Sequence, residues 1–151
     1  MCSKIVDGFT VAVRGIWRCM REEWHFRFHV VAAVYVSAFT PYFSLSRAEG
    51  AVLALTIAAV LAAELINSAV ERAVDRIGTE QHPLSGLAKD MAAGAVLTVA
   101  VAAIVVAILL FWKPDVWAQI FADFGEHLYK PVIFALSAVA AVLFVWKWRA
   151  K

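Results

Sequence analysis

The apolar run from Met91 to Trp112 constrains this chain most, because it contains no charged side chain over 22 residues. A helix rises about 1.5 Å per residue, so a run of this length crosses the roughly 30 Å hydrocarbon core of a bilayer. The whole chain is 63% hydrophobic, whereas soluble globular proteins contain about 45–50% apolar residues. We therefore expect an all-α integral membrane protein, because helices satisfy their backbone hydrogen bonds within lipid.

Three more apolar segments precede or follow this run, at residues 28–45, 50–71 and 131–146. The predicted span that contains the charge-free run covers residues 90–112. If the four segments alternate in direction, the arginines and lysines concentrate on one side, and only Arg47, Lys113 and Lys130 lie on the other. The positively charged side of a membrane protein faces the cytoplasm. The pattern predicts a multi-pass protein of the cytoplasmic membrane with both termini in the cytoplasm.

Two segments are predicted to lie in the membrane interface instead of crossing it. In residues 4–27, apolar side chains recur every three or four positions, with Arg14, Arg18 and Arg21 on the opposite side. This pattern is typical of a helix in the headgroup plane. Within the C-terminal segment 113–151, "DVWAQIFADFGEHLY" has the same character, and it precedes the fourth span.

Composition excludes two other classes of site. A net charge of +2, without a basic face, argues against nucleic-acid binding. Cys2 and Cys19 both lie in the N-terminal segment, without the spacing of a disulfide framework or zinc site.

A stripe of polar residues interrupts the second apolar segment. At about 100° per residue, Glu64, Asn67, Glu71 and Asp75 fall within an arc of about 80° on one helix face. An ionisable group within a span costs at least about 2.5–3.5 kcal/mol, so a positive or proton-donating group must meet this face. Local pairing is an alternative for some of them: Asn67 with a neighbouring helix, and Arg72 with Asp75.

A short polar loop follows, and Lys89 and Asp90 are predicted in the first turn of the next helix. A helix N-terminus with an added lysine suits a phosphate group, although such a lysine also commonly anchors a span at the membrane surface. Carboxylates beside a phosphate-binding cation are what phosphoryl transfer requires. The GxxxxGK[ST] motif is absent, so a P-loop enzyme is excluded.

At these residues the chain resembles the small bacterial membrane lipid kinases, the diacylglycerol kinase and undecaprenol kinase family. "AELINSAVERAVDRIG" is similar to the family signature E-x-x-N-[ST]-A-x-E-x-x-x-D, and "HPLSGLAKDMAAGAV" is similar to its A-K-D signature. "FTVAVRGIWRCMREEWHFRFH" resembles the N-terminal pattern, so the resemblance covers residues 8–112, and we take 1–112 as a lipid kinase domain.

The resemblance implies a role for each matching position. Glu64 matches the catalytic base that takes the proton of the lipid hydroxyl, and Glu23 and Glu71 match the carboxylates that hold Mg²⁺. Positions around ATP are matched by further residues, namely Asn67, Asp75, Glu80, His82, Lys89 and Asp90. It also implies a homotrimer whose active sites form between protomers, on the cytoplasmic side of the bacterial membrane.

The choice of lipid and the C-terminal segment are less determined. "AELIN", "HPL", "AKDMAAGAV" and "FRFH" favour an undecaprenol kinase, whereas "DRIGTE" and the methionine after A-K-D resemble diacylglycerol kinases. Residues 113–151 extend beyond the family pattern, and a plain membrane anchor is the simplest interpretation. A small proton or cation transporter and a catalytically inactive adaptor are the alternative functions, because buried membrane carboxylates also mark ion paths.

Overall fold

The computed structural model describes residues 2–77 and 83–146, and within these residues every regular element is a helix. The elements are α1 (Cys2–Glu22), α2 (Trp24–Phe39), the 3₁₀ helix η1 (Thr40–Phe43), α3 (Arg47–Ile77), α4 (Pro83–Phe111), α5 (Pro114–Glu126) and α6 (Tyr129–Trp146). The predicted all-α class is confirmed.

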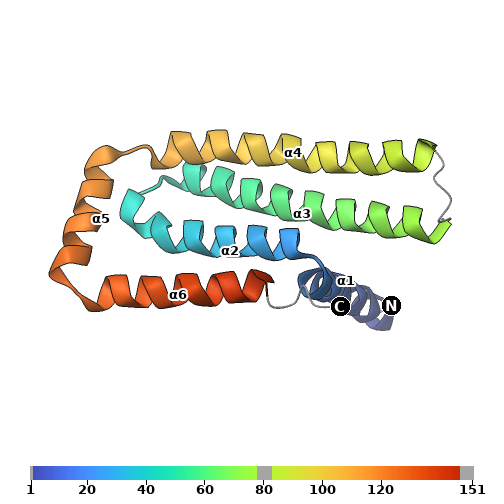
Figure 1. The fold of residues 1–151 in the computed structure, drawn as a ribbon, viewed down its shortest axis with the longest axis horizontal. Coiled ribbons are helices and arrows are strands. Elements are labelled where there is room, and N and C mark those ends of the chain that lie inside the picture. The colour runs from blue at the N-terminus through green and yellow to red at the C-terminus, as the bar shows by residue number, and fades with distance from the viewer. Residues whose placement is uncertain (1, 78–82, 147–151) are drawn as a thin grey trace.

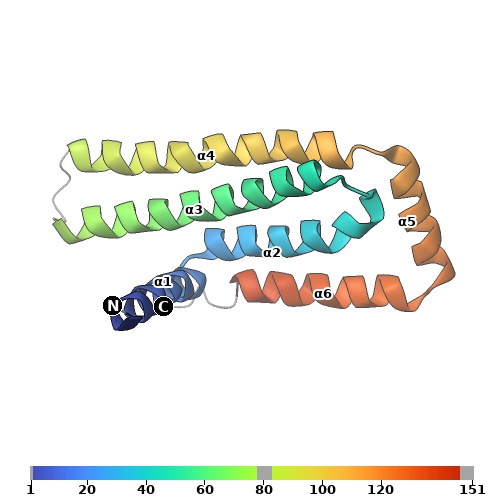
Figure 2. The ribbon, with the colours of Figure 1, turned by 180° about the vertical axis from the view of Figure 1, so that it is seen from behind.

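Four of the helices lie side by side in a single row, in the order α4, α3, α2, α6 (Figure 1), and the view from behind gives the same order (Figure 2). Neighbours in the row run in opposite directions. Helix α5 crosses one end of the row, and α1 lies at the other end. The end with α1 is called the polar end below, and the end with α5 the aromatic end.

Three helices in the described part of the chain are long and apolar enough to cross a membrane, namely α3, α4 and α6. Helix α2 has 16 residues and is about 24 Å long at 1.5 Å per residue, so the first predicted span stays a prediction. The surfaces of the three long helices expose large apolar side chains, including Leu55 (71%) and Leu109 (75%). Such surfaces suit lipid contact and confirm an integral membrane protein.

The helix boundaries differ from the predicted segments at two places. The surface helix was expected to continue to residue 27, but Glu23 interrupts it with an extended backbone (φ −106°, ψ 116°), and α2 begins at Trp24. Apolar residues with helical spacing continue through both helices, so the pattern does not reveal the break. Helices α3 and α4 also extend beyond the predicted spans at the polar end, where an ion pair joins them through Asp75 and Lys89.

A reciprocal cap starts α3. The backbone N–H of Ser46 donates to Glu49 Oε2 at 2.7 Å, and the N–H of Glu49 donates to Ser46 Oγ at 3.2 Å. This capping box satisfies two N–H groups that a helix start leaves unpaired. Ser44 just before it is left-handed (φ 47°), which completes the turn from η1 into α3 and sets α2 and α3 antiparallel.

Aromatic side chains hold the helices together at the aromatic end of the row. Phe43 is 1% exposed, and its ring centroid lies 4.8 Å from that of Phe111 and 5.4 Å from that of Trp117. Trp117 Nε1 donates to the Phe111 carbonyl at 2.9 Å. The apolar face predicted for 115–129 is thus turned inward at Trp117 and Ile120, while Phe121 is 69% exposed.

Candidate functional site

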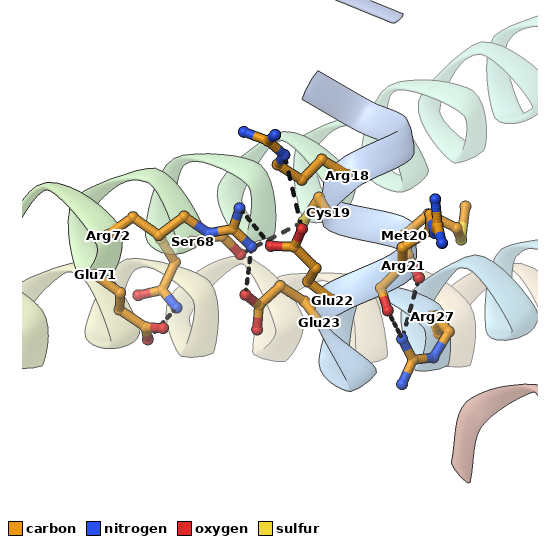
Figure 3. A network of polar contacts seen from close by, with 11 residues as sticks. Arg18, Cys19, Met20, Arg21, Glu22, Glu23, Arg27, Ser68, Glu71 and Arg72 are labelled. Atoms are coloured by element: carbon orange, nitrogen blue, oxygen red, sulfur yellow. Dashed lines mark hydrogen bonds and ion pairs between the residues drawn. The ribbon is translucent and has the colours of Figure 1, made fainter. Parts of the chain in front are cut away.

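The candidate site lies at the polar end, where α1 and the start of α2 meet the last turns of α3 (Figure 3). Helix α3 contributes the predicted polar stripe. Glu64 and Ser68 are buried, at 5% and 6% exposed, whereas Asp75 near the helix end is exposed. The stripe therefore passes from the interior of the helix row to its surface.

Glu64 meets a histidine of the neighbouring helix. Its Oε1 lies 3.2 Å from Nε2 of His29 on α2, and the two side chains are 6% and 21% exposed. Two further acids, Glu23 and Glu71, lie near enough to act on Glu64 electrostatically, as does His25. A ring nitrogen of His29 thus lies within reach of the Glu64 carboxylate on the same chain.

Arg72 joins α3 to the junction of α1 and α2. Its guanidinium lies 2.9 Å from Glu22 Oε2 and 2.8 Å from Glu23 Oε1, and Arg18 Nε lies 3.7 Å from Glu22 Oε1 (Figure 3). The alternative of an Arg72–Asp75 pair is wrong, because Arg72 turns toward Glu22 and Glu23 and Asp75 pairs with Lys89. This arrangement holds Glu23 beside α3.

A second contact between α1 and α3 involves Cys19, which is 4% exposed and has its Sγ 3.5 Å from Ser68 Oγ. Burial raises the pKa of the Cys19 thiol, while the hydrogen bond to Ser68 acts in the opposite direction. A buried neutral thiol packs as a small apolar group, so Cys19 contributes to the packing of α1 against α3.

Asn67 and Glu71 form a pair within α3. Asn67 Nδ2 donates to Glu71 Oε1 at 2.8 Å, while Asn67 Oδ1 is buried and lacks a hydrogen-bond partner among the described residues. Burying a polar oxygen without a partner costs about 1–3 kcal/mol. Such an oxygen is a candidate for a contact that the chain alone does not supply.

The acids and Asn67 do not form a closed metal cage. Among the described residues no group of three or more His, Cys, Asp or Glu side chains is placed to hold a metal ion. Mg²⁺ is commonly held by one or two carboxylates together with phosphate oxygens and water, so a complete protein cage is not required. Glu23, Glu71 and the unpaired Asn67 oxygen are ligands of the type that Mg²⁺ prefers.

The predicted nucleotide positions are brought together only in part. Lys89 Nζ forms an ion pair with Asp75 and joins α3 to α4, and Asp90 is exposed on α4. Helix α4 begins at Pro83 instead of near Lys89, so the free N–H groups of its first turn lie about 9 Å from Lys89 along the axis. Lys89 can still present its charge, but not at a helix start. Glu80 and His82 lie outside the described residues.

Sequence analysis assigned Arg27 no role of its own, although the residue lies within the quoted segment "FRFH". The Arg27 side chain is buried, with 1% of the residue exposed. Its Nε and Nη2 donate to the Val145 carbonyl of α6 at 3.2 and 3.0 Å. Its Nη1 donates to the carbonyls of Met20 and Arg21 at 3.1 and 3.0 Å (Figure 3). Carbonyls at helix C-termini lack partners within the helix and carry partial negative charge. Arg27 thus caps two helices and fastens the C-terminal segment beside the site.

Comparison with known proteins shows the family to which the chain belongs. Residues 10–111 match the family model described as prokaryotic diacylglycerol kinase. The matched region includes α2, α3 and α4 and ends at the last residue of α4, so α5 and α6 lie outside it.

Individual relatives carry two enzyme names. An undecaprenol kinase of Bacillus subtilis is 38% identical over 109 residues, which cover 72% of this chain and 89% of the relative. A diacylglycerol kinase of Escherichia coli K12 is 33% identical over 113 residues, covering 70% and 93%. A Synechocystis diacylglycerol kinase is 38% identical over 111 residues, covering 73% and 63%. The chain belongs to the prokaryotic diacylglycerol kinase family and is a lipid kinase.

Proposed function

We propose that this chain transfers the γ-phosphate of ATP to the primary hydroxyl of a membrane lipid alcohol, at the cytoplasmic face of the cytoplasmic membrane. The observation that carries the proposal is the buried carboxylate of Glu64, next to His29 and near the acids Glu23 and Glu71. A general base must lie within hydrogen-bond reach of the proton that it removes. In the proposed reaction this proton belongs to the lipid hydroxyl, which would have to approach the Glu64 carboxylate in α3.

In the proposed reaction, Glu64 acts as the general base. The lipid O–H proton passes to the Glu64 carboxylate, the hydroxyl oxygen forms a bond to the γ-phosphorus, and the bond from that phosphorus to the β,γ-bridging oxygen breaks, leaving ADP. Glu23 and Glu71 would hold Mg²⁺ with the help of Asn67 Oδ1. A divalent ion in this place neutralises phosphate charge.

Nucleotide binding is assigned to Asn67, Asp75, Lys89 and Asp90, together with Glu80 and His82. When ATP binds, Lys89 would leave its ion pair with Asp75 and pair with a phosphate oxygen instead. The Lys89 side chain is 38% exposed and the Asp75 side chain is 65% exposed. Exposed ion pairs contribute only about 0–1 kcal/mol, so this exchange costs little.

Undecaprenol is the favoured substrate and diacylglycerol the second. Relatives named for each of the two substrates have similar sequence identity to this chain. Sequence identity therefore does not distinguish undecaprenol from diacylglycerol as the substrate. The segments "AELIN" and "FRFH" support undecaprenol. The two alcohols differ mainly in their apolar chains, which would contact the exposed apolar faces of the helices.

The experiment is phosphate transfer from labelled ATP in mixed micelles, with undecaprenol and dioleoylglycerol supplied separately and together. Wild type is compared with Glu64→Gln, which removes the base but keeps nearly the same shape and is expected to lower kcat by about 10²- to 10⁴-fold. Glu71→Gln should instead raise the Mg·ATP concentration needed for half-maximal rate. A fully active Glu64→Gln variant would contradict the base assignment, and preferential labelling of dioleoylglycerol would reverse the order of substrates.

We also propose a homotrimer with active sites shared between protomers. The exposed apolar faces of α3 and α4 leave room for contacts between copies. Light scattering with the detergent contribution subtracted gives the number of protomers. Mixing two inactive variants, Glu64→Gln and Asp90→Asn, should restore part of the activity if one site uses residues of two protomers. A monomer in detergent would contradict the homotrimer. A mixed oligomer without recovered activity would contradict active sites that are shared between protomers.

A further inference from the structure

His29 lies between Glu64 and the apolar interior of the helix row. Its Nε2 is 3.2 Å from Glu64 Oε1. On its other side it lines a small cavity of about 110 Å³ between α2, α3 and α4, whose remaining lining residues are apolar or threonine, such as Val36, Leu53 and Thr56. His29 is the residue at which the cavity meets the carboxylate.

The carboxylate of Glu64 needs such a neighbour for physical reasons. A buried ionised group is stable only when hydrogen-bonded or paired, and Glu64 is 5% exposed. A neutral imidazole that donates from Nε2 can hold one carboxylate oxygen and leaves the second oxygen free to receive a proton. The imidazole itself is held edge-on against the Phe28 ring, with centroids 5.5 Å apart, which limits the directions in which the Nε2–H group points.

We propose that His29 is a positioning residue for the lipid kinase reaction, holding Oε1 of Glu64 so that Oε2 faces the lipid hydroxyl. The inference rests on the proposed role of Glu64 as the base and assigns a function to a histidine outside the predicted site residues. It acts through Glu64 and does not itself take the proton. Misplacing a reacting group by about 1 Å lowers a rate by about 10²-fold, so loss of this contact should lower kcat by about 10- to 100-fold.

The test compares side chains that keep or lose the donor at the position of Nε2. His29→Gln places an amide N–H at nearly the same reach, His29→Asn is shorter by one methylene group, and His29→Phe keeps a ring without a donor. We expect His29→Gln to retain most of kcat, and the other two variants to lose about 10- to 100-fold with KM for lipid and ATP within about twofold. His127→Phe, a change at an exposed histidine of the aromatic end, is the matched control and should be unchanged.

A double-mutant cycle separates positioning from a purely structural role. In the Glu64→Gln background there is no base to orient, so His29→Phe should lower the residual rate by less than about twofold. Equal losses in both backgrounds, or equal kcat in His29→Gln and His29→Asn, would overturn the proposal. If His29→Phe does not fold, the Gln and Asn variants decide the question alone. If Glu64→Gln is inactive while every His29 variant is fully active, only this inference fails; an active Glu64→Gln variant removes the proposed base itself.

Discussion

The two ends of the helix row differ in the main contacts that join their helices. At the polar end, charged groups of α1, α2 and α3 pair across helices, as Arg72 does with Glu22 and Glu23. At the aromatic end, rings of η1, α4 and α5 pack around the buried Phe43. Ion pairs that are partly exposed are weak and exchangeable, whereas close-packed rings are not. The chain thus keeps its rearrangeable contacts where ligands would bind and its fixed contacts where α5 reverses the chain.

The strongest test of this contrast is a cavity at the aromatic end. Phe43→Ala should cost about 3–5 kcal/mol in the free energy of unfolding, because a fully buried ring leaves a cavity behind. The kcat per folded molecule should stay within about twofold of wild type. Denaturant unfolding in mixed micelles and phosphate transfer by the same samples measure the two effects.

Phe121 provides the matched control for this change. Its side chain is 69% exposed, so Phe121→Ala should alter stability by less than about 0.5 kcal/mol. A large loss in kcat for Phe43→Ala, with the protein folded, would show that the two ends are not separable in function.

The second test concerns the arginine that fastens α6 at the polar end. Arg27→Met keeps the apolar stem but leaves the carbonyls of Met20, Arg21 and Val145 without their donor. We expect a loss of about 1–3 kcal/mol and faster amide hydrogen exchange in the last turns of α1 and α6. Arg18→Met is the control, because Arg18 is 68% exposed and pairs only at 3.7 Å with Glu22. Unchanged exchange at α6 would show that other contacts hold it.

The third test removes the ion-pair partner of Glu23 and leaves Glu23 itself in place. Arg72→Gln deletes both ion pairs to the junction of α1 and α2, and because these groups are partly exposed the stability should fall by no more than about 1 kcal/mol. If Glu23 is a metal ligand, loss of the group that orients it should raise the Mg²⁺ concentration for half-maximal rate by about 10-fold. A magnesium titration at saturating ATP and lipid measures this. An unchanged midpoint would separate Glu23 from metal binding.

Much of the fold could be predicted from the sequence, because its signals are local. A charge-free run fixes α4, and the spacing of Glu64, Asn67, Glu71 and Asp75 fixes one face of α3. The break at Glu23 was missed because apolar side chains continue across it in helical register. It depends on how α1 packs against α3 through Cys19 and Ser68, which is information that no local pattern contains.

The composition of the candidate site was predictable, but not its pairing. The acids and Asn67 follow from the resemblance, and the segment "FRFH" contains His29. Which residue lies beside Glu64 nevertheless depends on the register between α2 and α3, so the contact between His29 and Glu64 was not predicted. Arg27 was counted among the positive charges of the cytoplasmic side, yet it is buried, and four hydrogen bonds to helix-end carbonyls make this burial possible. Those carbonyls come from two segments that lie far apart in the sequence.

The smallest expected effect lies at the aromatic end and depends on pH. Asp123 on α5 accepts hydrogen bonds from Lys130 Nζ at 2.5 Å to each carboxylate oxygen, and this contact, more than any other, holds the pKa of Asp123 below its ordinary value. A depressed carboxyl pKa stabilises the fold above the unfolded-state value, and the contribution is lost as the pH falls through the lower folded-state value. His127 Nδ1 also lies 3.3 Å from Asp123, so the comparison uses a His127→Gln background.

In that background, Asp123→Asn should lower Tm by a constant small amount between about pH 5 and 8, and the difference should shrink below about pH 4, where Asp123 itself becomes protonated. Thermal unfolding in mixed micelles of the two variants across this range measures it. The kcat should not differ at any pH, because Asp123 lies on α5, which crosses the end of the row opposite to α1 and the candidate site (Figure 1). A difference in Tm that widens as the pH falls below 4 would mean that the protonated carboxyl is the stabilising form. A difference in kcat would mean that the exposed joint between α5 and α6 communicates with the polar end, against the separation on which the comparison rests.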